Sequence, residues 1–157
     1  MDSKKVYSIV EAQSKMENYC AYQERCHQEV ANKLWEMQLI PEAVEKIMLH
    51  LFEHDYLNES RFAKAYAHGK FSIKKWGKNR IVNELKRRKI SPFNINLALQ
   101  EISDEEYYKT FNALAEKRLA QIKETNTYKK RKKLADYLLY RGWESDMVYA
   151  KVTKLIH

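Results

Sequence analysis

The residues with the clearest chemical meaning are basic side chains crowded between residues 61 and 90, where Glu84 is the only acid. They are Arg61, Lys64, Lys70, Lys74, Lys75, Lys78, Arg80, Lys86, Arg87, Arg88 and Lys89. Two amphipathic helices can be drawn through the segment, divided near Trp76 and Gly77, with an apolar stripe opposite the cations. Such a positive face favours binding to a polyanion or to an acidic protein groove. It indicates binding and does not indicate a reaction.

A second basic cluster follows Tyr128, at residues 129–133, and reads KKRKK. We expect it to open a helix, where the helix dipole disfavours cations, so local stability does not explain it. Contact with phosphates or acidic side chains explains it, and a merely solvated face is the alternative. The formal net charge of the chain, +8, also favours nucleic acid or an acidic protein as the partner. Aromatic residues lie between the cations, but their helical spacing predicts that most of them are core residues and not base-stacking surfaces.

Residues that could support catalysis or metal binding are sparse. His50 and His54 have the i, i+4 spacing that places two ligands on one helix face, yet no HExxH pattern or nearby cysteine accompanies them. Cys20 and Cys26 lie six residues apart without a matching histidine cluster, which disfavours zinc and favours half-buried thiols in a reducing cytoplasm. Phosphate-binding loops and nucleophile elbows are not found in the sequence. We therefore expect no enzyme, no metal and no cofactor.

The elements that position the basic residues must be helices. Only three glycines and two prolines occur in 157 residues, too few turn formers for a hairpin-rich fold, and helix-favouring residues dominate. The first residues lack the apolar segment of a signal peptide, and no apolar run is long enough to cross a bilayer. These features predict an all-α, cytoplasmic protein without a membrane segment, in which residues 1–6 form a frayed tail.

A repeat appears when the chain is compared with itself. Starting from Leu34, Leu85 and Leu138, the positions 7, 10, 14 and 17 residues further on carry corresponding residue types, and the position 5 residues on is always apolar. The matching sets are Pro41, Val44, Met48 and Leu51; Pro92, Ile95, Leu99 and Ile102; Ser145, Val148, Val152 and Leu155. The three starting leucines are separated by about 50 residues. This spacing predicts a helix, a short turn and a second helix, three times over.

Each predicted helix pair is preceded by room for another helix. The first such helix spans residues 8–24, with Ile9, Ala12 and Met16 on its inner side; the others begin near Asn58 and at Ser103, two residues suited to N-caps. We therefore predict three tandem three-helix repeats at residues 1–54, 55–102 and 103–157. Because a 50-residue unit has a small core, neighbouring repeats are expected to share burial in an elongated, curved array. A closed bundle would also satisfy the periodicity.

With the repeat established, the sequence resembles the RecX family, bacterial regulators of the RecA recombinase. Residues 56–63 (YLNESRFA) resemble the family signature "gyLdd-RFA", and residues 77–90 (GKNRIVNELKRRKI) resemble its "G...I...L..kgI" stretch. Weaker matches are Arg25, Glu29, Lys33 and Leu34 upstream, and Tyr137, Leu138 and residues 141–143 downstream. The chain departs from the family pattern at Asn58, at Cys26-His27 and at Lys89, where an acid, a serine and a glycine are usual.

The resemblance implies a non-enzymatic, monomeric protein that lies in the helical groove of the RecA–DNA filament and bridges protomers. It implies inhibition of the ATPase, strand-exchange and co-protease activities of RecA in DNA repair and the SOS response, with weak, salt-sensitive affinity for DNA. By matching position, we expect Phe62, Tyr66, Ile81 and Leu85 to be structural. The expected contact residues are Arg61, Lys64, Lys74, Lys75, Lys78, Arg80, Arg87, Arg88, Lys129, Lys130, Arg131 and Lys132.

Two other interpretations are compatible with the basic face. A helical DNA-binding module would place a basic helix in a major groove and bind duplex tightly without any partner protein. A scaffold would direct its basic face to another acidic protein and be indifferent to DNA. In all three cases Arg87 and Arg88 are predicted to lie on the solvent face, where charge reversal leaves the fold intact.

Overall fold

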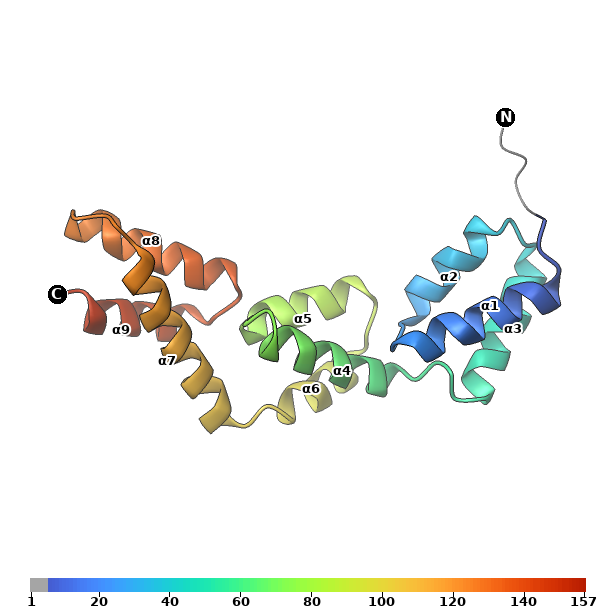
Figure 1. Ribbon diagram of the computed structural model, residues 1–157. Coiled ribbons are helices and arrows are strands. Elements are labelled where there is room, and N and C mark those ends of the chain that lie inside the picture. The colour runs from blue at the N-terminus through green and yellow to red at the C-terminus, as the bar shows by residue number, and fades with distance from the viewer. Residues whose placement is uncertain (1–5) are drawn as a thin grey trace, which may run out of the picture.

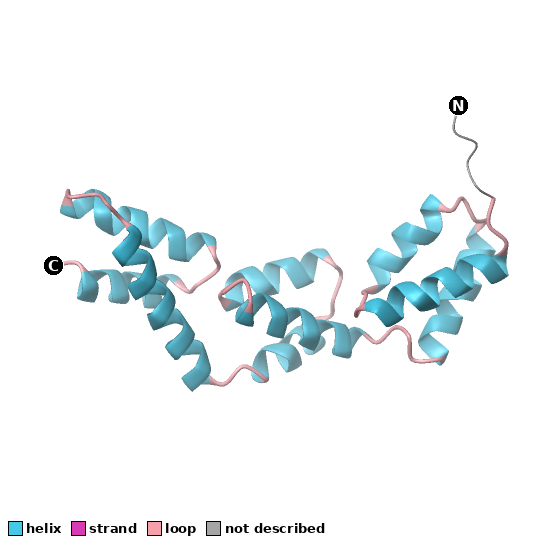
Figure 2. Cartoon of the chain, viewed as in Figure 1, coloured by secondary structure: helices cyan, strands magenta, loops and turns pink. Residues whose placement is uncertain are grey.

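The computed structural model describes residues 6–157, which form nine α-helices and no strand (Figures 1 and 2). The helices are α1 (Ile9–Tyr22), α2 (His27–Glu36), α3 (Pro41–Glu53), α4 (Glu59–Ser72), α5 (Lys78–Arg87), α6 (Pro92–Gln100), α7 (Asp104–Gln121), α8 (Thr127–Tyr140) and α9 (Ser145–Leu155). The all-α prediction is confirmed. The tail predicted at residues 1–6 lies, except for Val6, outside the described residues.

Several helices begin where a side chain can satisfy the free amides of the first turn. The side chains of Ser8, Asn58, Ser91, Ser103 and Asn126 each accept a hydrogen bond from the amide three residues further on. The caps predicted at Asn58 and Ser103 are thus confirmed, with distances of 2.9 Å to the Arg61 amide and 3.1 Å to the Glu106 amide. Pro41 and Pro92 occupy first-turn positions, where proline loses no hydrogen bond.

The turn after each repeat's anchoring leucine has the same backbone conformation in all three repeats. The fourth residue after the leucine has a positive φ: 58° at Gln38, 64° at Lys89 and 96° at Gly142. In the second and third repeats the next amide then bonds back to the leucine carbonyl, at 3.1 Å for Ile90 and 3.2 Å for Trp143. A left-handed residue at this point is the usual way to end a helix. Lys89 therefore adopts the same type of turn in which the family has glycine.

Side by side, the three helix triplets form an elongated, curved array with the two chain ends at opposite extremes (Figure 1). The triplet α1–α3 lies at one end, α4–α6 in the middle and α7–α9 at the other end. This arrangement confirms the predicted array and is incompatible with the closed bundle that the periodicity also allowed.

Residues 6–157 contain two hydrophobic cores and not three. One cluster lies within the first triplet and contains Leu34, while a single cluster contains both Leu85 and Leu138 and runs through the second and third triplets. Sharing of burial, predicted for all neighbours, is therefore extensive only between the second and third repeats. Between the first and second repeats, the buried residues that belong to the neighbour's cluster are Cys26 and Leu57, and half-buried Tyr56 packs against the first cluster. Ile9, predicted to face inward, is 41% exposed because it sits at the open first turn of α1.

Two turns form part of the contact between the second and third repeats. The α4–α5 turn packs on the α8–α9 turn, where the Gly77 amide donates to the Arg141 carbonyl at 2.8 Å. The Trp143 indole donates to the Lys75 carbonyl at 3.1 Å and packs its ring against Phe111, with centroids 5.2 Å apart. Backbone hydrogen bonds and a buried tryptophan make this junction a continuous piece of the core.

Candidate functional site: a basic face on the second and third repeats

The basic segment of residues 61–90 folds as α4, the α4–α5 turn and α5. Its apolar stripe is buried as predicted: Phe62, Ile81 and Leu85 are at most 4% exposed. The first turn of α5 carries Lys78 and Arg80 and no acid. Since cations at a helix start oppose the helix dipole, these residues reduce local stability and require another explanation.

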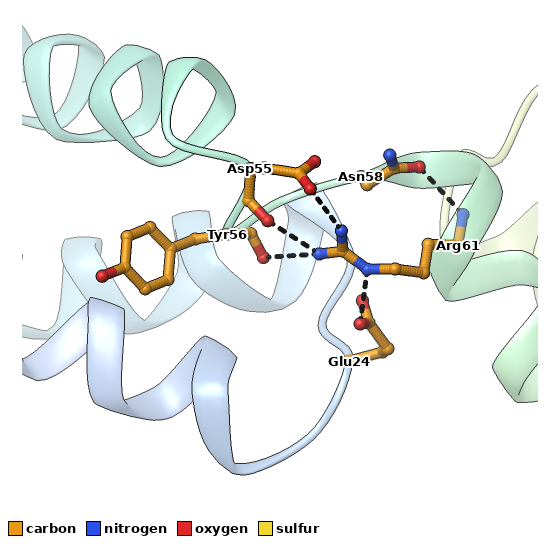
Figure 3. Close-up of polar contacts among 5 residues, drawn as sticks. All are labelled: Glu24, Asp55, Tyr56, Asn58 and Arg61. Carbon is orange, nitrogen blue, oxygen red and sulfur yellow. Dashed lines mark hydrogen bonds and ion pairs between the residues drawn. The ribbon is translucent and has the colours of Figure 1, made fainter.

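Arg61 forms hydrogen bonds and ion pairs with other residues of the chain (Figure 3). Its Nε donates to Glu24 Oε1 at 2.6 Å, and its terminal nitrogens donate to Asp55 Oδ2 at 3.0 Å and to the Asp55 carbonyl at 2.9 Å. The hydrogen bond with Glu24 raises the pKa of the guanidinium above its ordinary value, so the charge is held firmly. Arg61 thereby ties α4 to the chain between α1 and α2 and to the end of α3.

Replacing Arg61 with methionine is expected to lower the free energy of unfolding by about 1–2 kcal/mol, because Glu24 loses its charged donor. The value is modest since the Arg61 side chain is 38% exposed and solvent screens the pair. Urea unfolding of the Arg61→Met, Glu24→Gln and double variants measures the coupling, expected at about 1 kcal/mol. Arg87→Met serves as the control because the Arg87 side chain is 77% exposed. Additive single effects would contradict this role for Arg61.

Aromatic rings hold Arg80 and Lys78. The Arg80 guanidinium lies 4.2 Å from the centre of the Trp76 ring and 4.8 Å from that of Tyr140. Lys78 Nζ lies 4.6 Å from the centre of the Tyr107 ring. These cation–π contacts orient the charges without neutralising them. Both residues therefore remain available to an anion.

Arg87 and Arg88 differ in a way that the sequence did not predict. Arg87 is mostly exposed, but the Arg88 side chain is only 31% exposed. Arg88 donates to the Glu84 carbonyl at 3.0 Å and stacks 4.8 Å from the centre of the Tyr66 ring. The predicted solvent-face position is thus wrong for Arg88, because the ring of half-buried Tyr66 offers its aliphatic stem a packing surface.

Two further predicted residues lie in the α4–α5 turn, and one lies on α4. Lys74 and Lys75 are exposed, and the Lys75 ammonium donates to the Ser72 carbonyl at 2.7 Å. Lys64 pairs with Glu101 at 3.5 Å across α4 and the end of α6. Within residues 6–157, neither Lys74 nor Lys75 has a carboxylate within ion-pair distance.

The basic run of the third repeat lies at the start of α8, as predicted, and its cations differ in whether they have partners within the chain. Arg131 Nε donates to the Ile156 carbonyl at 3.0 Å, and Lys132 pairs with Asp136 at 3.0 Å. The Asp136 hydrogen bond raises the pKa of Lys132. Lys129 and Lys130 have no ion pair with any described residue. The uncompensated charge of this run is therefore at its start.

Two basic residues that sequence reasoning did not select join this surface. Arg118 on α7 and Arg141 after α8 flank the Tyr137 ring, with guanidinium carbons 4.5 Å and 4.7 Å from its centre. Arg141 also donates to the Lys74 carbonyl at 2.8 Å. No local pattern marks either residue, because the packing of α7, α8 and the α4–α5 turn brings them together.

Both cysteines and the His50–His54 pair lie in the first repeat. Cys20 and Cys26 are 7% and 1% exposed, so they are buried and not half-buried as expected. His50 Nε2 lies 2.9 Å from Glu17 Oε2, and His54 Nδ1 lies 2.9 Å from the His50 carbonyl. Residues 6–157 contain no group of three or more His, Cys, Asp or Glu side chains placed to hold a metal ion.

Burial raises the pKa of both thiols to about 11. The native state therefore keeps these protons between about pH 9 and pH 11, where the unfolded chain releases them, and stability falls as the pH rises through this window. Urea unfolding at several pH values measures the slope. We expect the Cys20→Ala/Cys26→Ala variant to lose less stability than the wild type between pH 9 and pH 11. Equal losses in the two proteins would show that the thiols do not titrate as stated.

None of the helices in residues 6–157 has the length and apolar character to cross a bilayer.

Two family domains and two known proteins that are similar to this chain belong to one family. The domain described as "RecX, second three-helix domain" matches residues 58–99, and "RecX, third three-helix domain" matches residues 104–152. Regulatory protein RecX of Clostridioides difficile (strain 630) is 24% identical over 148 residues, which cover 94% of this chain and 69% of that protein. Regulatory protein RecX of Leuconostoc mesenteroides is 25% identical over 149 residues, covering 95% of this chain and 56% of that protein.

Solved structures agree with the fold. The crystal structure of RecX from Lactobacillus salivarius superposes with a TM-score of 0.78 at 23% identity, covering 94% of this chain and 96% of that chain. A second crystal structure, of regulatory protein RecX, gives a TM-score of 0.81 at 23% identity, covering 93% of this chain and 73% of that chain. The shared fold thus includes nearly all of the helical array.

Proposed function

This chain belongs to the RecX family, and we propose that it regulates the RecA recombinase by binding along the helical groove of the RecA–DNA filament. The observation that supports this function most strongly is the extended array (Figure 1), two of whose three repeats carry clusters of basic residues. A filament groove offers phosphates and acidic side chains along a long path. Several weak contacts on one rigid array add up to an avidity that a single repeat lacks.

The contact surface that we propose consists of cations that no carboxylate of the described residues pairs with, together with Arg87, which pairs with Glu84 at 3.2 Å but has a side chain that is 77% exposed. They are Lys74, Lys75, Lys78, Arg80, Arg87, Lys129 and Lys130. Arg61, Arg88 and Arg131 are assigned to supporting positions, because each is held by hydrogen bonds within the chain. Lys64 and Lys132, which pair with Glu101 and Asp136, are assigned to the rim. In this role the protein is a cytoplasmic monomer that catalyses no reaction and inhibits RecA.

Titration of the protein into RecA that hydrolyses ATP on single-stranded DNA tests this function. We expect hydrolysis to fall, and the Arg87→Glu/Lys129→Glu variant to require about tenfold more protein for the same effect. The control Lys15→Glu/Lys46→Glu changes the net charge equally at exposed positions of the first repeat and should act like the wild type. Hydrolysis that is unaffected by the wild-type protein would refute the proposed function.

The amount of protein required distinguishes modes of action. Inhibition well below one copy per RecA protomer indicates filament capping or disassembly, whereas inhibition near equal amounts indicates coating of the groove. The second candidate is a DNA-binding module, favoured by the exposed basic face of α5. Tight binding to bare duplex DNA with a sequence preference, together with an unchanged ATPase, would favour that candidate.

A further inference from the structure

A basic groove lies at the junction of the second and third repeats. Its first part, about 400 Å³, is bounded by the α4–α5 turn, α7 and the end of α8. Five cations line it, with no carboxylate among the lining residues: Lys74, Lys75, Lys117, Arg118 and Arg141. Only two of these, Lys74 and Lys75, belong to the basic segment of residues 61–90.

No acidic side chain of the described residues neutralises the positive charges around this part of the groove. None of the five cations has a carboxylate of residues 6–157 within ion-pair distance. Arg118 Nε is buried and has no hydrogen-bond acceptor among the described residues, although its guanidinium is held against Tyr137. A buried charged donor without an acceptor is destabilising, and like charges around one hollow repel each other. An anion in the groove would relieve the repulsion among the five cations.

The groove continues past Arg118 into a second part of about 600 Å³. The two parts share Arg118, Gln121 and Tyr137, and the second adds Lys123, Lys133 and Tyr140. Its one acid, Asp136, is paired with Lys132. Tyr140 is 75% exposed, so the groove combines a row of cations with an accessible aromatic ring.

We propose that this junction groove binds the backbone of a single-stranded nucleic acid, with a base stacked on Tyr140. Cations that follow the backbone and aromatic rings that stack bases are the two components of such sites. A duplex presents a convex cylinder with its bases covered, whereas a single strand can enter a hollow of this size and expose its bases. An acidic peptide satisfies the cations but does not require the Tyr140 ring, which is 75% exposed although Arg80 lies against it. The proposal rests on the proposed function, because it assigns the polyanion contact of a filament regulator to one groove.

Fluorescence anisotropy of a labelled oligothymidylate, titrated with the full chain over a range of salt concentrations, tests the site. Lys74→Glu/Lys117→Glu is expected to weaken binding about tenfold or more and to lower the log–log salt slope by about 1.4, since each lost phosphate contact contributes about 0.7. The control Lys15→Glu/Lys46→Glu, which has the same net charge as the groove variant, should bind oligothymidylate with an affinity closer to that of the wild type. Equal binding by the two variants would refute the groove as the site.

A second variant tests the stacking. Tyr140→Ala should weaken binding of the oligothymidylate by about fivefold or more, because stacking on one ring contributes substantially per base. The same change should leave the affinity for inorganic polyphosphate, which has charges but no bases, unaltered. Equal losses for both ligands would refute stacking. Binding of oligoglutamate, but not of oligothymidylate, in a manner sensitive to Lys74→Glu/Lys117→Glu would show that the groove takes an acidic protein segment.

The RecA assay separates this proposal from the function on which it rests. Oligothymidylate binding that depends on the groove, without any effect of the protein on RecA, would overturn the proposed function and support the groove. Inhibition of RecA, together with oligothymidylate binding that the groove substitutions leave unchanged, would support the proposed function and overturn the groove.

Discussion

Gly142→Ala is expected to cost about 3 kcal/mol or more of unfolding free energy. Gly142 has a φ of +96°, a conformation in which a side chain is strained. An added methyl group would also lie 2.5 Å from the Arg80 amide nitrogen and 2.9 Å from Arg80 Cα, both backbone atoms of α5. The junction between the second and third repeats can accept this group only by opening.

Gly69→Ala is the matched control, with the opposite sign. Gly69 lies inside α4, and a methyl group added there would meet no atom within 4 Å. Alanine is a better helix former than glycine, so this variant should gain about 1 kcal/mol. Urea unfolding followed by circular dichroism measures both. A Gly142→Ala variant as stable as the wild type would mean that the two turns do not pack as closely as described.

Leu85→Ala is expected to destabilise the second and third repeats together, by about 2–5 kcal/mol. Leu85 is 0% exposed in the hydrophobic cluster that runs through both of these repeats. Removing its methyl groups leaves a cavity in a core that the two repeats share. Leu34→Ala makes the same change at the corresponding position of the first repeat, whose cluster is separate. It should destabilise α1–α3 by a similar amount and leave α4–α9 nearly unaffected.

Amide hydrogen exchange resolved by peptide distinguishes these outcomes, because it reports the free energy of local opening for each segment. Leu85→Ala should speed exchange throughout α4–α9 and spare α1–α3, and Leu34→Ala should show the complementary pattern. Faster exchange along the whole chain in both variants would indicate one cooperative unit, and would contradict the division into two cores.

The sequence by itself determined the helices and their threefold repetition. Helix starts are coded by near neighbours, as at Ser103 and the Glu106 amide. The spacing of the apolar residues that follow each anchoring leucine follows from helix geometry. The segment of residues 61–90 could likewise be recognised as basic on one face and apolar on the other. These features depend on residues close together in the chain, so they can be recognised from the sequence alone.

What the tertiary structure decided is which cations remain free. Arg61 meets Glu24, which lies 37 residues earlier, and Arg88 meets the ring of Tyr66 on another helix. Arg118 and Arg141 reach Tyr137 and the α4–α5 turn only once the third repeat has packed on the second. Side-chain partners of this kind depend on contacts between helices far apart in the sequence. The charge of a residue is therefore readable from its type, but its availability to a ligand depends on what the packed repeats place beside it.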